Sequence, residues 1–424
     1  MHFIQREAQN FSKHAPPCMF LAVAFVFSIF VAQLPAQPDR GYIMQTVPYP
    51  VYATPEQANY NLKFGRMIAR INGGVQFEFN DNIGLGLQER QSDLSIGPTL
   101  DFGFMIPYSR EHILQLDLGI GYRWYLNHPA VSSLSLAPRS RVDYRGYAGN
   151  VQFNLHDAFQ IQSDPVQRPE VFGAPEKVMR FRRFNNTIGA IAEWRPVRRL
   201  GITFGYDYAI DRSMTGQFKD LDYDGHTFSL GAFYTASSKL VLGLNNSYSM
   251  TIYRQNIQND GWAYTIGPVI SYQLTRFISL DAAAGYTTSQ FDQTGTIGDT
   301  SGFSSITFQT GLRHRVNSRT TQSLRVGRAL GVGYGSNYTE TWGFQYNLNT
   351  RVHRAVSLNT MFSYSHFRAS RGDSGDAYQL YFGTGYQLTK RWNVGIGYSY
   401  SWKTSDLGRD YEQNRLTLDF RRQF

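Results

Sequence analysis

The chain has one cysteine, Cys18, and this residue lies before the main apolar run of the sequence. A mature protein that begins after Ala36 would contain no cysteine at all. This absence excludes a disulfide framework and any catalysis by a thiol.

Long apolar runs are also scarce. The longest is MFLAVAFVFSIFVAQLPAQ, which starts at Met19 and follows the basic residues Arg6 and Lys13. Basic residues, a short apolar core and small residues near Ala36 predict a secretory signal peptide over residues 1–36, with an uncleaved anchor helix as the alternative. No later run is long enough for a membrane helix, which excludes a helical membrane protein.

Charged residues make up only 17% of the chain, whereas aromatic residues reach 15%. The 41 basic and 32 acidic residues become 39 and 31 once Arg6, Lys13 and Glu7 leave with the signal peptide. The positive excess is spread along the chain and forms no basic arm. We therefore expect contact with anionic lipids or solutes and no binding of nucleic acid.

Motifs of the common enzyme classes are missing too. The sequence contains no HExxH, no GxSxG and no GxxxxGK[ST], which are typical of zinc proteases, serine hydrolases and phosphate-binding loops. The histidines after the signal peptide are scattered and lack the spacing of metal ligands; they are His112, His128, His156, His226, His314, His353 and His366. We predict that the protein is not an enzyme and has no resident cofactor.

What the sequence repeats is an alternation of apolar and polar residues. In ILQLDLGIGYRWYL, the apolar side chains from Leu114 to Leu126 share one parity, while Gln115, Asp117 and Arg123 lie on the other. The pattern recurs in GITFGYDYAID, WAYTIGPVISYQL, TWGFQYNLN and WNVGIGYSYSW. A period of two indicates strands with one apolar and one polar face. Runs of this length with aromatic ends are typical of strands that cross a bilayer at a tilt.

The polar face separates two architectures. A soluble sandwich or barrel would point its apolar face inward. Here the other face consists of Gly, Ser, Thr, Asn, Gln and charged residues, which suit a wet lumen better than a dry core. With lipid outside, a sheet pairs all of its backbone groups only by closing on itself. The predicted fold is all-β: a transmembrane, antiparallel, up-and-down β-barrel over residues 67–424.

Eighteen runs qualify as strands. Tight connections such as VNSRT and LTKR follow every even-numbered strand, and mostly longer ones such as FDQTGTIGDTSG follow the odd-numbered strands. Because outer-membrane barrels have short periplasmic turns and longer outer loops, this parity predicts that both termini are periplasmic. The strands are expected to begin near Ile68, Leu94, Glu111, Pro138, Asn150, Arg183, Leu200, Asp224, Leu240, Gly261, Phe277, Phe303, Thr321, Thr339, Ala355, Asp376, Trp392 and Tyr411.

Two places depart from the pattern. The fourth and fifth strands are joined by a turn of a few residues, and Asp157 interrupts their apolar face, so a barrel of 16 strands without them is the alternative. Arg328 shares its parity with Leu324, Val326 and Leu330. An arginine that faces lipid at mid-depth costs about 2–4 kcal/mol. We therefore expect a local bulge at Arg328 or a position at the membrane interface.

Six segments share the character of a known group of proteins: FEFNDNIGL, SDLSIGPTLDFGF, LQLDLGIGYRWYLNHP, VQFNLHDAFQIQSDP, RRFNNTIG and the terminal YEQNRLTLDFRRQF. Together they cover most of the mature chain and resemble the outer-membrane β-barrel porin families of bacteria, close to β-barrel porin type 2. The resemblance implies a location in the bacterial outer membrane. It also implies a function as a porin, or a link to exopolysaccharide or envelope functions.

The chain ends inside an alternating pattern, RLTLDFRRQF, with no polar tail. We expect this last strand to close against the first strand and to place Phe424 at the periplasmic interface. The resemblance to outer-membrane barrels implies that barrel-assembly machinery reads this strand. The residues of its lipid face are Leu416, Leu418, Phe420 and Phe424.

One loop has a metal-like spacing. Asp220, Asp222 and Asp224 in DLDYDG match the first half of a calcium loop. The twelfth position is Gly231 rather than glutamate, and it belongs to the next strand. A calcium site and a solvated acidic tip of an outer loop are both open interpretations.

Several charged residues are predicted on the lumen face: Asp117, Arg123, Asp207, Asp281, Arg313, Arg315 and Arg325. A barrel of this size leaves an aqueous channel, and opposite charges on facing walls would orient solutes in it. Alternatively, these charges pair with one another, and residues 37–66 plug the lumen or extend into the periplasm. We predict a passive diffusion porin for small hydrophilic solutes. The alternative is an exopolysaccharide-export or envelope-structural barrel without free conductance.

Overall fold

The computed structural model describes residues 60, 62–86, 90–109, 111–162, 182–216, 218–333, 335–408 and 410–424, without the side chains of 137–139. The predicted signal peptide, residues 1–36, and all but the last few residues of the predicted segment 37–66 lie outside this part of the chain.

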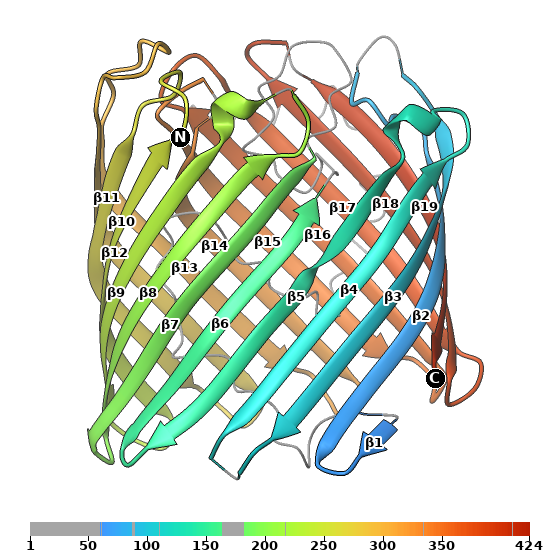
Figure 1. Cartoon of the computed structure of the whole chain (residues 1–424), viewed down its shortest axis with the longest axis horizontal. Helices are drawn as coiled ribbons and strands as arrows, with labels where there is room; N and C mark the ends of the chain where they lie inside the picture. Colours follow the sequence, from blue (N-terminus) through green and yellow to red (C-terminus); the bar gives the residue numbers. More distant parts are fainter. Residues whose placement is uncertain are drawn as a thin grey trace.

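The described residues form a closed antiparallel barrel of 18 strands, β2–β19 (Figure 1). Each strand pairs with its neighbours in the sequence, and β19 pairs with β2 to close the barrel. The strands are β2 (Met67–Asn80), β3 (Asp93–Pro107), β4 (Ile113–Tyr125), β5 (Ser133–Ala148), β6 (Val151–Gln162), β7 (Arg183–Val197), β8 (Leu200–Ser213), β9 (Tyr223–Thr235), β10 (Leu240–Tyr253), β11 (Gly261–Gln273), β12 (Ile278–Phe291), β13 (Phe303–Arg315), β14 (Thr320–Val332), β15 (Tyr338–Arg351), β16 (Val356–Ala369), β17 (Ser374–Gln387), β18 (Trp392–Ser405) and β19 (Tyr411–Gln423).

The strand count predicted from the alternation is confirmed, and the alternative of 16 strands is wrong. The predicted starts lie within two residues of the observed ones except at Pro138, since β5 already begins at Ser133. The register of β5 on β6 shifts between Leu136 and Ser140, so the proline lies in an irregularity of the ladder. A bulge tolerates proline because it needs no ladder hydrogen bond there. Asp157 on the outward face accepts a hydrogen bond from Asn186 of β7.

The last strand, β19, closes the barrel against β2. The ladder between β19 and β2 runs from Arg415 opposite Asn80 to Gln423 opposite Asn72. The backbone N–H of Phe424 then donates to the carbonyl of Ile71 at 3.1 Å. Beyond this point a short strand, β1 (Leu62–Phe64), pairs with the first residues of β2. Since the other edge of β2 is occupied by β3, β1 continues the line of β19 and covers the edge that β19 leaves free.

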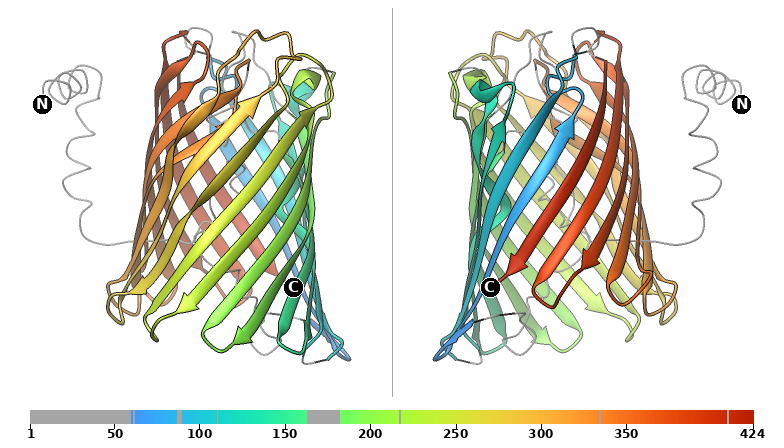
Figure 2. Two further views of the ribbon diagram at one scale, coloured as in Figure 1. Left: turned by 90° about the vertical axis from the view of Figure 1, so that its left-hand side faces the viewer. Right: turned by 90° about the vertical axis from the view of Figure 1, so that its right-hand side faces the viewer.

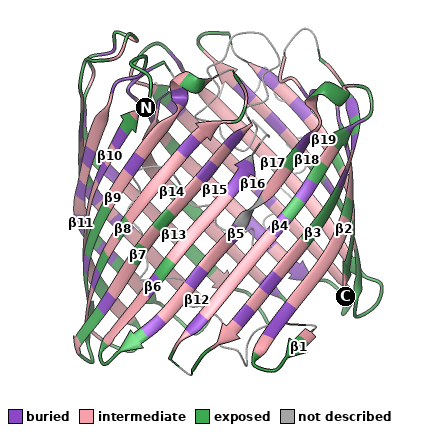
Figure 3. Ribbon diagram, viewed as in Figure 1, coloured by how far each residue is buried: buried purple, intermediate pink, exposed green. Residues whose placement is uncertain are grey.

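Burial changes from residue to residue along the strands (Figure 3), and the two faces of the sheet differ in it. One face carries large apolar side chains that are exposed, such as Ile306 (59% exposed) and Leu244 (51%). The opposite face carries polar side chains that crowd one another, so that Glu78 is only 3% and Ser95 only 1% exposed. Side chains splay apart on the convex face of a barrel and crowd on its concave face. The apolar face therefore points outward and the polar face lines the interior, which is the arrangement of a barrel that stands in lipid.

The two ends of the barrel also differ (Figure 2). Connections between β3 and β4, β5 and β6, and onward in pairs to β17 and β18 are tight, and they lie at the end where the chain terminates. The other connections are mostly longer and lie at the opposite end. We call these the tight-turn end and the long-loop end. The short helices η1 (Pro129–Val131) and η4 (Lys219–Leu221) belong to long-loop connections. No helix in the described ranges is long and apolar enough to cross a membrane.

The irregularity expected at Arg328 exists, but it is a break in the ladder rather than a bulge with one extra residue. Pairing between β13 and β14 stops at Phe308 opposite Arg328. Arg328 fills the break: Nη1 donates to the carbonyl of Ile306 at 2.8 Å, and Nε donates to Glu340 Oε1 at 2.8 Å. The Arg328 and Glu340 side chains are each only 17% exposed. The arginine is therefore not solvated by lipid.

Side chains near this break show that the strands on its two sides overlap instead of lying edge to edge. Leu330 has outward parity and yet is fully buried. Tyr338, which is opposite Val332 on the same face, packs edge-on against Phe303 with ring centroids 5.4 Å apart, although Phe303 has inward parity. The outward face of β14 and β15 thus packs here against the inward face of β13. This overlap supplies contacts that the missing ladder would otherwise provide.

Candidate functional site

The interior wall formed by β2–β8 carries its charges in pairs. The ion pairs are Arg70 with Asp117 (3.2 Å), Arg123 with Glu78 (2.8 Å), Arg141 with Asp143, and Arg183 with Asp211, and His156 Nε2 shares a hydrogen bond with Asp207 at 2.8 Å. Most of them join different strands and lie among other polar groups; Gln115, for example, donates to the second oxygen of Asp117 at 2.6 Å. These contacts account for Asp117, Arg123 and Asp207 among the residues predicted to line the lumen. On this wall the predicted internal pairing holds, and positive and negative groups balance locally.

The opposite wall is different. Arg313 and Arg315 on β13 and Arg325 on β14 have inward parity and are exposed. Within the described part of the chain these three arginines have no acidic partner within ion-pair distance. Asp281, on the neighbouring β12, accepts a hydrogen bond from Ser271 Oγ at 2.7 Å instead. The structure therefore brings the three predicted arginines together on one side and leaves their charge uncompensated.

The excess of positive charge continues from β13 to β19. Judged by strand parity in the described ranges, Asp419 is the sole acidic residue on the inward face of these seven strands. Arg351 has inward parity and no acidic partner among the described residues, whereas Arg421 lies 3.9 Å from Asp419 and Arg415 is paired with Glu78 at 3.1 Å. Because β13–β17 lie behind β3–β8 in Figure 1, a basic wall faces a balanced wall across the interior. Such an arrangement creates a transverse field in the channel.

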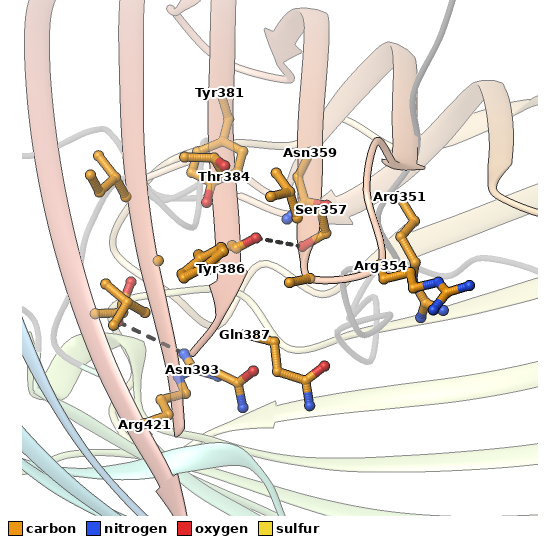
Figure 4. Close-up of a pocket in the computed structure, with 17 residues that line it drawn as sticks. Arg351, Arg354, Ser357, Asn359, Tyr381, Thr384, Tyr386, Gln387, Asn393 and Arg421 are labelled. Carbon is orange, nitrogen blue, oxygen red and sulfur yellow. Dashed lines mark hydrogen bonds and ion pairs between the residues drawn. The ribbon is translucent and has the colours of Figure 1, made fainter. Parts of the chain in front are cut away.

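A cavity of about 410 Å³ opens in the basic wall near the tight-turn end. Figure 4 shows Arg351, Arg354 and Arg421 around it, with the amides of Gln387 and Asn393 between them. Asp419 also lines the cavity, but Arg421 lies 3.9 Å from it and Gln76 donates to it at 3.0 Å. Guanidinium and amide groups are the donors that recognise carboxylates and other small anions.

Glycines give this cavity its depth. Gly385 and Gly395 are opposite one another on β17 and β18 and form part of its lining. Tyr381 lies across the neighbouring Gly383 and Gly397: a Cβ at Gly383 would be 2.4 Å from its hydroxyl oxygen, and one at Gly397 would be 3.0 Å away. Real Cβ atoms do not approach oxygen to 2.4 Å, so the ring keeps this position only because residue 383 is glycine. The aromatic ring thus forms one side of the cavity.

Sequence reasoning missed the cavity arginines. Arg351 ends β15 and Arg354 lies in the turn RVHR, so both look like ordinary turn residues in the sequence. Their convergence with Arg421 depends on the curvature of the sheet, which brings the end of β15 and the β15–β16 turn toward β19 although β16–β18 lie between them. The sequence signal that could have found two of them is strand parity, because Arg351 and Arg421 fall on the positions that face the lumen.

The aspartates of the predicted calcium loop already have protein partners. Arg183 Nη2 lies 3.0 Å from Asp222, and Arg254 Nε lies 3.0 Å from Asp224. Asp220 belongs to η4. Among the described residues no group of three or more His, Cys, Asp or Glu side chains is placed to hold a metal ion. Calcium binding at this loop stays a prediction, and it would require the arginines to release these carboxylates.

At the long-loop end, four connections are tied together by one polar cluster. Asn259 Nδ2 donates to Asn337 Oδ1 and to the carbonyl of Asp299, each at 2.8 Å. Asp299 accepts hydrogen bonds from the N–H of Asn337 at 2.8 Å and from the hydroxyl of Ser370. Burial alone would raise the pKa of the Asp299 carboxyl, but the hydrogen bonds from Ser370 and Asn337 outweigh it and hold the pKa below its ordinary value. These loops therefore form a fixed rim beside the channel mouth.

The predicted assembly residues lie where their parity placed them. Leu416, Phe420 and Phe424 are exposed on the outward face of β19, and Leu418 is opposite Phe77 on the same face. The Arg422 guanidinium lies over the Phe424 ring, 5.0 Å from its centroid. Their recognition by assembly machinery stays a prediction.

No protein-family model matches the chain, and no curated protein matches it in sequence. Several solved structures resemble it in shape. OccK5 (OpdH) of Pseudomonas aeruginosa is 13% identical, with a TM-score of 0.47 over 84% of this chain and 98% of that one. OccK2 (OpdF) of P. aeruginosa, in complex with glucuronate, is 12% identical, with a TM-score of 0.48 over 84% and 98%. A BenF-like porin from Pseudomonas fluorescens Pf-5 is 11% identical, with a TM-score of 0.49 over 84% and 99%.

Proposed function

We propose that the protein is an outer-membrane channel through which small hydrophilic solutes diffuse passively, and that the channel favours anions. The observation that carries this proposal is the unequal charge of the two interior walls. One wall pairs its charges, whereas Arg313, Arg315 and Arg325 on the other are exposed and lack acidic partners in the described structure. An anion that enters the lumen therefore meets donors that no carboxylate of the described residues occupies.

The cavity at the tight-turn end extends this path. Arg351, Arg354 and Arg421 lie at the end of the same wall, so an anion that leaves Arg313 or Arg315 finds a second set of cations further along. Conduction needs sites that bind a solute and then release it. Exposed arginines in high dielectric meet that requirement, because each contributes only modest attraction.

The barrel orientation belongs to the same proposal. The tight turns and both ends of the described chain, Tyr60 and Phe424, would face the periplasm, and the long loops would face the outside. On this arrangement the loop rim of Asn259, Asp299 and Asn337 stands at the outer mouth. The 410 Å³ cavity then lies near the periplasmic exit.

Planar bilayer recordings test the proposal directly. Reversal potentials in a potassium chloride gradient should show selectivity for chloride. A unit charge about 10 Å from a permeant ion in water contributes about 0.4 kcal/mol, so Arg313→Gln or Arg325→Gln should each lower the anion-to-cation permeability ratio about twofold. Glucuronate, the ligand of one of the similar structures, should pass faster than a neutral sugar of the same size.

Arg254→Gln is the matched control, because it removes the same charge from the outward face at the long-loop end. It should leave the permeability ratio unchanged. A channel with cation preference would contradict the proposed role of the basic wall. Folded protein that inserts without any conductance would instead favour the exopolysaccharide-export or structural alternative.

A further inference from the structure

A group of polar side chains lies on the outward face of β8–β10, near the long-loop end. We call it the outer-face cluster, and it consists of Tyr208, Arg212, Asp224, His226 and Arg254. Asp224 is its centre: one oxygen accepts hydrogen bonds from the Tyr208 hydroxyl at 2.8 Å and from Arg212, and the other accepts one from Arg254 Nε at 3.0 Å. Two guanidinium groups share one carboxylate, so the cluster carries a surplus positive charge.

Part of the cluster's hydrogen-bonding capacity is unused. The Arg254 side chain is 60% exposed, and within the described structure its Nη1 and Nη2 groups have no protein acceptor. His226 shares a hydrogen bond between Nδ1 and the Tyr206 hydroxyl at 3.0 Å, and its Nε2 has no hydrogen-bond partner among the described residues. Arg212, by contrast, already donates to the carbonyls of Asp211 and Tyr223. The unused guanidinium donors therefore belong to Arg254, the most exposed side chain of the cluster.

The surface below the cluster changes from polar to apolar with depth. Next to His226 comes an aromatic ledge, in which the rings of Tyr206 and Phe228 lie 4.9 Å apart. Further toward the middle of the barrel, Phe204, Leu230 and Leu244 are exposed on the same outward face. A cationic rim above aromatic and then aliphatic side chains is the sequence of environments that one lipid molecule spans.

We propose that the outer-face cluster binds the phosphate-bearing headgroup of an anionic membrane lipid, with the acyl chains along the ledge. Arg254 Nη1 and Nη2 donate to the phosphate oxygens, and Asp224 holds both guanidinium groups in place. The proposal rests on the membrane location assumed in the proposed function, but it does not require that the barrel conducts. Charge complementarity selects the ligand, because a zwitterionic headgroup offers the surplus cation no net negative partner.

A second arginine at the same end provides an internal comparison. Arg90 lies 2.6 Å from Glu412 and 4.0 Å from Asp81, and its side chain is 36% exposed. Here one cation faces two carboxylates, so no positive charge is left for a phosphate. Arg90→Gln therefore changes the same charge at a similar exposed position without touching the proposed site.

The experiment measures lipid binding by native mass spectrometry of the full mature chain in a neutral detergent. Dimyristoyl phosphatidylglycerol is the anionic probe and dimyristoyl phosphatidylcholine the zwitterionic one. The unmodified protein should retain phosphatidylglycerol preferentially, and Arg254→Gln should weaken that binding about tenfold, which is the loss of one charge-assisted contact. Arg254→Lys should recover part of it, and Arg90→Gln should have no effect.

The proposal would be overturned by equal retention of the two lipids, by an equal loss in Arg254→Gln and Arg90→Gln, or by displacement of phosphatidylglycerol by inorganic phosphate at equal concentration. The last result would assign the cluster to free anions instead of lipid. Heat-dependent mobility in gels shows whether each variant is folded, and a folded Arg254→Gln with unchanged binding also counts against the site. Failure of the porin proposal would appear in bilayer recordings and not in this assay.

Discussion

A charged side chain on the outward parity of a membrane strand is tolerable only when something other than lipid surrounds it. Arg328 meets this condition because β13 and β14 separate at that residue. Its guanidinium replaces a piece of the backbone ladder by donating to the carbonyl of Ile306 and to Ser305 Oγ, and Glu340 balances its charge. The side chain also lies near the Trp342 ring, 5.1 Å from the centroid.

We expect Arg328→Leu to destabilise the barrel by about 2 kcal/mol. Breaking a fully buried ion pair costs about 3–5 kcal/mol, and the cost should be smaller here because the Arg328 and Glu340 side chains each keep 17% exposure. Unfolding in urea from detergent micelles measures the change. The double variant Arg328→Met/Glu340→Gln should recover part of the loss, because no unpaired charge remains. A single variant as stable as the unmodified protein would show that lipid or water solvates Arg328 instead.

Sequence parity located the arginines of the lumen face but could not tell which of them are free. Arg123 and Arg325 have equivalent patterns around them in the sequence, yet Arg123 reaches Glu78 on β2 across one intervening strand, while Arg325 is exposed. That difference depends on which residues the register places opposite each other two strands away. The register is a property of the closed sheet and cannot be read from one strand.

At the scale of elements, the alternation predicted the strands because each strand needs apolar side chains on its lipid face and polar side chains on its lumen face. A strand with lipid on one side and water on the other cannot slip by one residue without moving every apolar side chain into the lumen. The prediction lost accuracy where the ladder itself is irregular. Pro138 falls at the register shift between β5 and β6, and Arg328 falls at the break between β13 and β14.

The terminal strand β19 carries a prediction of its own. Deleting Phe424 removes a half-exposed ring, whose burial is worth about 1 kcal/mol, and one N–H bond to Ile71. A barrel with a complete ladder from Arg415 to Gln423 should tolerate such a loss. We nevertheless expect precursor to accumulate in the periplasm, as immunoblots of cell fractions would show, because assembly machinery is expected to read the terminal aromatic. The truncated chain should still fold into detergent micelles.

Trp392→Ala is the control for that experiment. Trp392 is opposite Arg422 on the outward face at the same end, and its ring is also partly exposed. It should reach the outer membrane at the normal level, since it does not lie at the chain end. Normal levels of the Phe424 deletion would mean that β19 ends where it does only because β1 takes over the edge of β2 beyond Phe424.

At the scale of the whole molecule, the sequence predicted closure, strand number and the inside-out placement of polar side chains, because lipid leaves few other solutions for a sheet. It did not predict the cavity. Its arginines come from β15, the β15–β16 turn and β19, which the curvature of the sheet brings around one cavity although three strands lie between β15 and β19. Lumen shape also depends on Tyr381 lying over Gly383, a contact between residues of one face that alternation does not encode.

The orientation of the barrel is the remaining property of the whole molecule, and it can be tested by surface labelling. An epitope inserted at Gly372, which has a φ of +89° in the connection between β16 and β17, should be accessible to antibody on intact cells. An epitope at Ser237, in the tight turn between β9 and β10, should be labelled only after the outer membrane is opened. The reason is geometric: successive antiparallel strands alternate in direction, so one orientation fixes every connection. If Ser237 is labelled on intact cells, the whole barrel is inverted, the cavity of Arg351, Arg354 and Arg421 lies at the outer mouth, and anions meet it on entry.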